Sequence, residues 1–283
     1  MKGIQNKVQM DFSVAMCVYG GDCAEWFRSA VDSVINQTAV PSEIVLVVDG
    51  PVPDSLDKQI KECEADPLFH VIRLEKNVGH GNARRICLEN CKYDLVALMD
   101  ADDLSLPNRF EEQLKRFVLE DGVAIVGSDI TEFDGTPENR ISQRTVPERD
   151  ADIKAYMKKR CPMNQMTVMF RKDAVQKAGG YQDWFCNEDY YLWVRMALNG
   201  AVFANTGTVL VNVRVGKEMY ARRGGWKYFK SEAKLQKFMR KKRMIGLGRY
   251  WINVTERFVL QVLMPNRLRG WVFRKFARKK VQS

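Results

Sequence analysis

Hydrophobic residues in the first half of the chain form short unbroken runs separated by amphipathic stretches. The apolar runs cover residues 12–19, 43–48, 69–74, 94–99 and 123–127. Between them, apolar side chains recur at helical spacing over residues 22–36, 54–65 and 82–91, and another helix opens at Pro107 behind a capping Ser105. Apolar strands that alternate with helices are typical of a parallel sheet covered on both faces. The pattern predicts an α/β fold with a Rossmann-like, mostly parallel sheet.

The second half of the chain has a less regular pattern. Residues 129–146 are polar around an Asp134-Gly135 turn, which predicts a hairpin or a loop. The further expected elements are strands at 164–170 and 208–214, a short helix at 171–178 and a helix from Asn187 to Gly200. Everything after Gly225 has a helical pattern rich in cations. We therefore expect a catalytic domain over residues 1–225 and a helical extension over 226–283.

Polar residues stand where three of the predicted strands end, at Tyr19, Asp49 and Asp100. Ligands of open α/β sheets bind at the carboxyl ends of the strands. Asp100, Asp102 and Asp103 lie within four residues, and carboxylates this close repel each other unless a cation offsets them. Acids at a helix N-terminus are the alternative explanation, but three exceed what capping needs. The segment favours a site for Mg²⁺ or Mn²⁺, which prefer oxygen ligands.

Five segments, in the same order, resemble the motifs of family 2 glycosyltransferases, which have the GT-A fold. They are S13-V-A-M-C-V-Y, E43-I-V-L-V-V-D-G, N77-V-G-H-G-N-A-R, D100-A-D-D-L-S-L-P-N-R-F (the DXD segment) and N187-E-D-Y-Y-L-W-V-R. The run V213-R-V-G-K-E-M-Y-A-R-R-G-G is similar to a closing element of bacterial members. The resemblance covers roughly residues 10–225. It implies an inverting, metal-dependent transfer of a sugar from a nucleotide-diphosphate donor, with a UDP-sugar favoured.

The resemblance also implies roles for single residues on the donor side. The nucleotide-sugar site would contain Val18, Tyr19, Asp49, Arg84, Asp100 and Ala101, and the metal ligands would be Asp102 and Asp100. Asp49 can also be read as a plain turn residue in D-G-P, and either Arg84 or its neighbour Arg85 could face the site. Diphosphate would be neutralised by Arg214, Arg222 and Arg223, for which solvated surface charge is an equal alternative.

On the acceptor side, the resemblance makes Asp189 the general base, with Glu188 beside it. Acids at a helix start are also stabilising for the helix alone, so capping is the competing explanation. Trp184, Trp193 and Arg195 are the acceptor-side candidates. The turn G79-H-G81 lacks the spacing and position of a dinucleotide-binding loop, so we expect His80 to be an exposed loop residue.

Charge is distributed unevenly along the chain, whose net charge is +10. From Trp226 onward there are 17 Lys and Arg against 2 Asp and Glu, interleaved with large apolar residues. This composition favours a helix lying at an anionic membrane surface. A helix packed on the catalytic domain with a basic outer face is the alternative, and nucleic acid is a weaker third because no recognisable binding fold accompanies the charge.

Compartment and function follow from these features together. No apolar run is long enough to span a bilayer, no signal peptide is visible, and the seven cysteines have irregular spacing, which favours reduced thiols in the cytosol. We expect a peripheral enzyme of the cytoplasmic membrane face that extends a saccharide or a lipid-linked saccharide in surface-polysaccharide synthesis. The alternatives are a sugar-phosphate nucleotidyltransferase and a non-catalytic membrane- or nucleic-acid-binding protein. The oligomeric state does not follow from the sequence.

Overall fold

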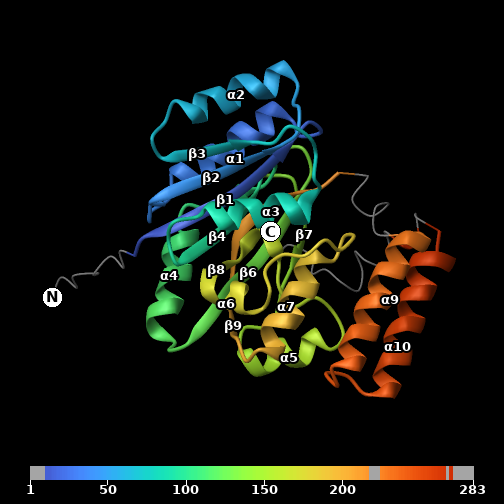
Figure 1. The fold of residues 1–283 in the computed structure, drawn as a ribbon. Helices are drawn as coiled ribbons and strands as arrows, with labels where there is room; N and C mark the ends of the chain where they lie inside the picture. Colours follow the sequence, from blue (N-terminus) through green and yellow to red (C-terminus); the bar gives the residue numbers. More distant parts are fainter. Residues whose placement is uncertain (1–9, 217–223, 266–267, 270–283) are drawn as a thin grey trace.

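The computed structural model describes residues 10–216, 224–265 and 268–269. Its centre is one sheet with the strand order β3-β2-β1-β4-β8-β6-β9-β5, and β7 pairs with β6 (Figure 1). The strands are β1 (Phe12–Tyr19), β2 (Glu43–Asp49), β3 (Phe69–Arg73), β4 (Leu95–Asp100), β5 (Leu104–Ser105), β6 (Val123–Phe133), β7 (Arg140–Arg144), β8 (Met169–Arg171) and β9 (Val202–Arg214). Helices cover both faces, which confirms the expected α/β fold.

Seven helices of the described residues precede β9 in the chain. They are α1 (Ala24–Ile35), α2 (Asp54–Glu64), α3 (His80–Asn90), α4 (Arg109–Leu119), α5 (Asp150–Met157), α6 (Lys172–Lys177) and α7 (Glu188–Leu198), with a 3₁₀ turn, η1, at Gln165–Thr167. Each predicted strand and helix of the first half is present. Ser105 does not cap α4, however, because it lies in β5, paired with Val211 of β9, and α4 begins four residues later.

The two halves of the sheet differ in strand direction. β1 pairs in parallel with β2 and β4, and β2 with β3. β8 is antiparallel to both β4 and β6, while β6 and β9 are parallel. The expected hairpin around Asp134 is formed by β6 and β7. The strand expected at 164–170 is wrong in detail, since η1 takes up its first part and the strand is only Met169–Arg171.

Alternating side chains of the central strands belong to two hydrophobic clusters, one on each face of the sheet. Val14, Met16 and Val18 of β1 pack with α1 and α4. Ala15, with Val47 of β2 and Leu98 of β4, belongs to the cluster under α3 and α7. Because orientation alternates along a strand, the side chains of Asp49 and Asp100, two residues beyond Val47 and Leu98, face the α3 side. The alternation of side chains along β2 and β4 therefore puts both aspartates on the same face of the sheet.

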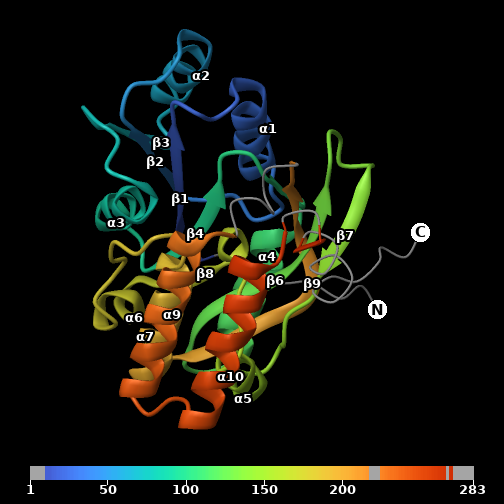
Figure 2. The ribbon, with the colours of Figure 1, turned by 90° about the vertical axis from the view of Figure 1, so that its right-hand side faces the viewer.

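The C-terminal part of the described chain folds as a helix pair against the sheet and its helices. It consists of α9 (Trp226–Lys241), α10 (Leu247–Phe258) and a π-helical turn, η2 (Val259–Leu263). Figures 1 and 2 show the pair alongside α5 and α7. Leu235 and Met239 of α9 belong to the same hydrophobic cluster as the sheet and α7. Among the described residues, no helix has the length and apolar character that crossing a membrane requires.

Candidate active site

The carboxyl ends of β1, β2 and β4 bring the donor-side candidates to one edge of the sheet. In the strand register, Tyr19 lies opposite Asp49, and Cys17 lies opposite Asp100. Tyr19 is 44% exposed and presents its ring at this edge. The side chains of Val18 and Ala101 point into the hydrophobic cluster on the other face, so only their backbone atoms can reach a ligand.

Asp49 fixes the loop that leads into α3. Its carboxylate oxygens accept hydrogen bonds from the amides of Val78 (2.7 Å) and Gly79 (3.2 Å). Gly79 has φ 87°, a conformation that favours glycine. The side chain is buried, and both of its carboxylate oxygens take part in these bonds. The structure thus supports a loop-fixing role for Asp49, and contact with a nucleotide base remains a prediction.

Arg84, rather than Arg85, faces the site. Its guanidinium forms an ion pair with Asp100 and donates through Nε to Nε2 of His80 at 2.9 Å. Burial opposes the charge, but Asp100 outweighs it and raises the pKa of Arg84 above its ordinary value. One terminal nitrogen, Nη1, is buried and lacks a hydrogen-bond partner in the described structure. Arg85 lies on the surface and pairs with Glu89 at 2.9 Å.

His80 joins the donor side to the predicted catalytic helix. It is the first residue of α3 rather than part of a loop, although its side chain is 51% exposed, as expected. Its Nδ1 lies 2.9 Å from Oε1 of Glu188. Since Nε2 accepts from Arg84, Nδ1 carries the proton and donates to the Glu188 carboxylate. Asp100, Arg84, His80 and Glu188 therefore form a continuous chain of polar contacts, which we call the polar relay.

The three acids of the DXD segment have different surroundings. Asp103 is buried and accepts a hydrogen bond from the backbone N–H of Arg214 at 2.9 Å, so it holds the segment against β9. Asp102 remains partly exposed. Burial, together with the nearby Asp100 and Asp22 carboxylates, raises the pKa of Asp102 to about 6. This crowding of negative charge is what a bound divalent cation would relieve.

Arg214 is held in place by several partners. Its guanidinium lies between the rings of Trp26 (4.8 Å) and Phe133 (4.7 Å) and donates to the backbone carbonyls of Asp102 and Gly135. It therefore supports the DXD segment directly, and its phosphate-side role remains a prediction. Arg222 and Arg223 lie outside the described residues.

Asp189 lies in the first turn of α7, next to Glu188. Its carboxylate accepts from the backbone N–H of Tyr190 at 2.6 Å, and the Cys161 sulfur lies 3.8 Å away. Burial and the negative charge of Glu188 raise the pKa of Asp189 to about 6. A carboxylate with this pKa is ionised at neutral pH and is a better proton acceptor than an ordinary aspartate. Asp189 thus has the properties required of a general base.

Two of the three acceptor-side candidates are wrong. Trp193 is fully buried between Phe170 and Tyr181, so no face of its ring is open to a sugar. Arg195 is 8% exposed and donates to the carbonyls of Ala178 (2.5 Å) and Gly180 (2.7 Å), which makes it a support of the loop before α7.

Trp184 is the candidate that reaches a surface groove. It stacks on Tyr191 with ring centroids 4.1 Å apart, and Nζ of Lys234 lies 4.0 Å from its ring. The groove is lined by Gln182, Asp183, Trp184, Tyr191, Lys234, Lys237, Phe238 and Lys241. An indole beside three ammonium groups suits a ligand that carries both a sugar ring and negative charge.

Arg109 is a supporting residue that the sequence pattern does not reveal. It is completely buried, donates to the carbonyl of Leu98 at 2.6 Å and to the hydroxyl of Ser105 at 2.9 Å, and so braces the chain on both sides of the DXD segment. Burial lowers the pKa of Arg109 to about 9. The only sequence signal was its place at the end of the DXD resemblance.

Comparison with known proteins decides the family. The family described as Glycosyl transferase family 2 matches residues 13–179, which include the DXD segment and every donor-side candidate before it. The chain is a family 2 glycosyltransferase. The matched segment ends before Glu188 and Asp189, so the catalytic role of these two residues stays a prediction.

Curated relatives of this glycosyltransferase align over almost their whole length. One is the amylovoran biosynthesis glycosyltransferase AmsE of Erwinia amylovora, with 36% identity over 93% of this chain and 98% of that protein. Another is an Escherichia coli UDP-Gal:alpha-D-GlcNAc-diphosphoundecaprenol beta-1,3-galactosyltransferase, with 34% identity over 95% and 97%. The family assignment therefore extends to the region around α7 and the C-terminal helices.

Solved structures support the fold. S. aureus TarS residues 1–349, crystallised with UDP-GlcNAc, matches with a TM-score of 0.65, 15% identity, and coverage of 88% of this chain and 73% of that one. At this identity the likeness concerns the fold, and it confirms the GT-A arrangement expected from the sequence.

Proposed function

We propose that this glycosyltransferase moves a sugar from a UDP-sugar to a lipid-linked, diphosphate-bearing saccharide, with inversion at the anomeric carbon, during surface-polysaccharide synthesis. The observation that carries the proposal is the polar relay, which links the end of β4 to the first turn of α7. It connects a donor-side arginine to Glu188, the residue directly before the proposed base Asp189, whose pKa is raised to about 6. The relative named for amylovoran biosynthesis and the relative named for galactosyl transfer to GlcNAc-diphosphoundecaprenol support the substrate class.

In the proposed reaction, Asp189 accepts the proton of an acceptor hydroxyl as that oxygen attacks the anomeric carbon. The elevated pKa of Asp189, caused by burial and Glu188, favours this proton transfer near neutral pH. Glu188 in turn is fixed by His80, so the base is held at a defined place relative to the donor edge. The unpartnered Nη1 of Arg84 is available to a negatively charged donor group.

The residues present fit a divalent cation of the Mg²⁺ or Mn²⁺ kind. Asp102 and Asp100 offer carboxylate oxygens, and burial together with the neighbouring Asp100 and Asp22 carboxylates raises the pKa of Asp102, which a bound cation would offset. Such a cation supplies neutralisation of the diphosphate leaving group when bound. Among the described residues no group of three or more His, Cys, Asp or Glu could hold a metal alone, so we expect tight binding to require the donor's diphosphate.

The acceptor end of the proposal rests on the groove beside α9. Lys234, Lys237 and Lys241 are suited to a diphosphate, and Trp184 to the sugar attached to it.

We further propose that residues 1–225 act as the catalytic unit, that residues 226–283 form its extension, and that the enzyme works at the cytoplasmic face of the membrane.

Nucleotide-dependent thermal stabilisation tests the donor site. UDP with Mn²⁺ should raise the melting temperature of the wild type more than UDP, GDP, TDP or CMP alone, because a ligand that binds only the folded state stabilises it. Asp102→Asn should lose the metal-dependent part, while Asp173→Asn, an exposed aspartate on α6, should keep it. Equal stabilisation by every nucleotide, with and without metal, would contradict the proposed donor site.

A further inference from the structure

The helix α10 packs on the domain through polar side chains. Its two buried residues are Asn253, fully buried, and Arg257, 9% exposed; Gln261 of η2, 6% exposed, continues the row at the same spacing of four. A surface helix of a globular protein ordinarily buries its apolar face and exposes its polar one. The inward row of α10 and η2 is the reverse of that arrangement.

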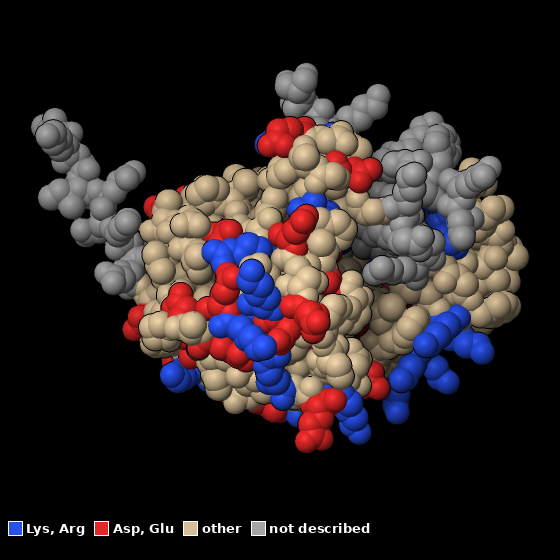
Figure 3. Space-filling view, turned by 90° about the horizontal axis from the view of Figure 1, so that it is seen from above, with Lys and Arg blue, Asp and Glu red and all other residues tan. Residues whose placement is uncertain are grey.

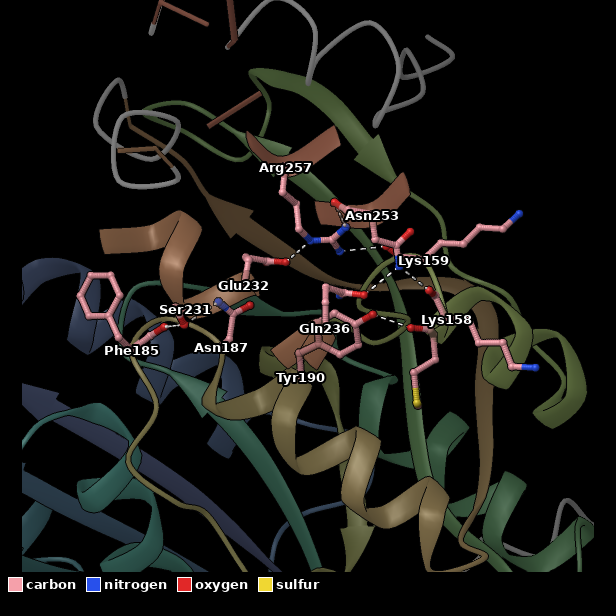
Figure 4. Close-up of polar contacts among 11 residues, drawn as sticks. Lys158, Lys159, Phe185, Asn187, Tyr190, Ser231, Glu232, Gln236, Asn253 and Arg257 are labelled. Atoms are coloured by element: carbon pink, nitrogen blue, oxygen red, sulfur yellow. Dashed lines mark hydrogen bonds and ion pairs between the residues drawn. The ribbon is translucent and has the colours of Figure 1, made fainter. Parts of the chain in front are cut away.

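Two members of the inward row, Asn253 and Arg257, bond to specific partners (Figure 4). Asn253 donates to the carbonyl of Lys158 (2.8 Å) and to the side chain of Gln236 (2.7 Å). Arg257 pairs with the buried Glu232 of α9 and donates to the carbonyl of Lys159 at 2.9 Å. These bonds attach α10 firmly to α9 and to the end of α5.

The outward face of α10 and η2 is mostly apolar, with the exposed Thr255 as the polar member of its row. Leu247, Trp251, Val259 and Leu263 follow one another at multiples of four residues, with exposed fractions of 57%, 58%, 41% and 61%. Positions two residues apart differ by about 200° around a helix, so this row faces away from Asn253 and Arg257. Ile252 and Trp226 add further exposed apolar surface nearby. We call this set the outer apolar stripe.

The charge around the outer apolar stripe limits what can cover it. Residues 226–265 contain ten Lys and Arg but only two acids, Glu232 and Glu256, and Glu232 forms an ion pair with Arg257. Figure 3 shows this end of the molecule, at the right, as a mostly uncharged surface with a group of basic side chains beside it. A second copy of the chain would bring like charges together across a twofold interface. Anionic lipid headgroups have the complementary charge, and acyl chains accept the stripe.

We propose that the outer apolar stripe inserts into the headgroup region of an anionic bilayer and docks the enzyme there. The inference rests on the proposed function, because a lipid-linked acceptor lies in such a surface. It also explains the inverted helix: polar bonds hold α10 to the protein so that its apolar side remains available to lipid.

The docked helix pair is tied to the catalytic helix. Ser231 of α9 donates to the carbonyl of Phe185 at 2.6 Å and accepts from the side chain of Asn187 at 3.2 Å, next to Glu188 at the start of α7 (Figure 4). The bilayer surface and the base are therefore held in one rigid arrangement, which fixes how the acceptor's sugar is presented.

Vesicle cosedimentation of the full-length protein tests the docking surface without donor or acceptor. Vesicles of phosphatidylcholine with phosphatidylglycerol are compared with pure phosphatidylcholine, at low salt and at about 0.5 M salt, where electrostatic attraction is largely screened. The variant Trp251→Gln/Leu263→Gln should lower the binding that survives high salt at least tenfold. The control Val118→Gln/Leu119→Gln removes two apolar residues, 53% and 77% exposed, at the end of α4 and should bind like the wild type.

Two results would overturn the docking proposal. One is equal vesicle binding by the stripe variant and the wild type at both salt concentrations. The other is a wild-type dimer, seen by light scattering, that the stripe variant converts to monomer, since a second copy would then cover the stripe. A water-soluble acceptor separates docking from chemistry: loss of vesicle binding with retained transfer to it implicates docking alone. Vesicle binding without any transfer contradicts the proposed function instead.

Discussion

The ionisation of Asp189 should control how the transfer rate depends on pH. A general base acts only when ionised, and burial together with Glu188 raises the pKa of Asp189 to about 6. About one enzyme molecule in ten then carries the ionised base at pH 5, and about nine in ten at pH 7. We therefore expect kcat/KM to rise about tenfold per pH unit below 6 and to level off above 7.

A pH profile alone does not identify the group, because the pKa of Asp102 is also raised to about 6. Their causes differ, however. Glu188 contributes to the shift of Asp189, whereas Asp100 and Asp22 contribute to that of Asp102. Removing the negative charge with Glu188→Gln should lower the pKa of Asp189. The ratio of kcat/KM at pH 5 to that at pH 7.5 should then increase.

The assay is release of UDP from the donor in the presence of a synthetic saccharide-diphosphate-lipid, with Asp173→Asn as a surface control of the same kind. Asp189→Asn should lower kcat by about 10²- to 10⁴-fold, the usual contribution of a general base, and abolish the acid limb. An unchanged pH ratio in Glu188→Gln, or a full acid limb in Asp189→Asn, would refute the assignment of the base.

Three further substitutions test the supporting contacts. Arg84→Lys should weaken UDP binding and turnover tenfold or more, because a single ammonium cannot bond both partners of the guanidinium, while Arg85→Lys on the surface should behave as wild type; calorimetric titration with UDP measures both. Arg257→Met should reduce the free energy of unfolding by about 3–5 kcal/mol, since Glu232 is left buried and unpaired, and Arg257→Met/Glu232→Leu should recover most of it in denaturant titrations. Lys237→Ala should raise the KM for the diphosphate-linked acceptor several-fold and leave the donor KM unchanged. A change in the donor KM alone would contradict the acceptor-side role of Lys237.

Much of the fold followed from the apolar pattern because β1, β2 and β4 are buried on both faces. Their unbroken apolar runs can be read without knowing any neighbour, and the acids that end them mark the ligand edge. The antiparallel β8 was harder, since its short strand is defined by pairing with β4 and β6 rather than by its own residues.

The misassigned site residues share a physical cause. The helix α7 is covered by the sheet on one side and by α9 on the other, so apolar residues occur on both of its sides. The sequence pattern therefore could not show that Trp193 is buried rather than exposed. His80 owes its role to Glu188, 108 residues away, and no local spacing encodes that contact. For α10 the sequence favoured a helix at a membrane surface, but no local pattern encodes the bonds from Asn253 and Arg257 to the carbonyls of Lys158 and Lys159.

Product formation tests the central claim most directly. Purified full-length enzyme is incubated with a panel of nucleotide-sugars, Mn²⁺ and a saccharide-diphosphate-lipid, and the product's anomeric configuration is determined by NMR. We predict transfer from one α-linked UDP-sugar to give a β-linked product, with transfer lost in both Asp189→Asn and Asp102→Asn. A product with retained configuration, or undiminished transfer by Asp189→Asn, would contradict the account.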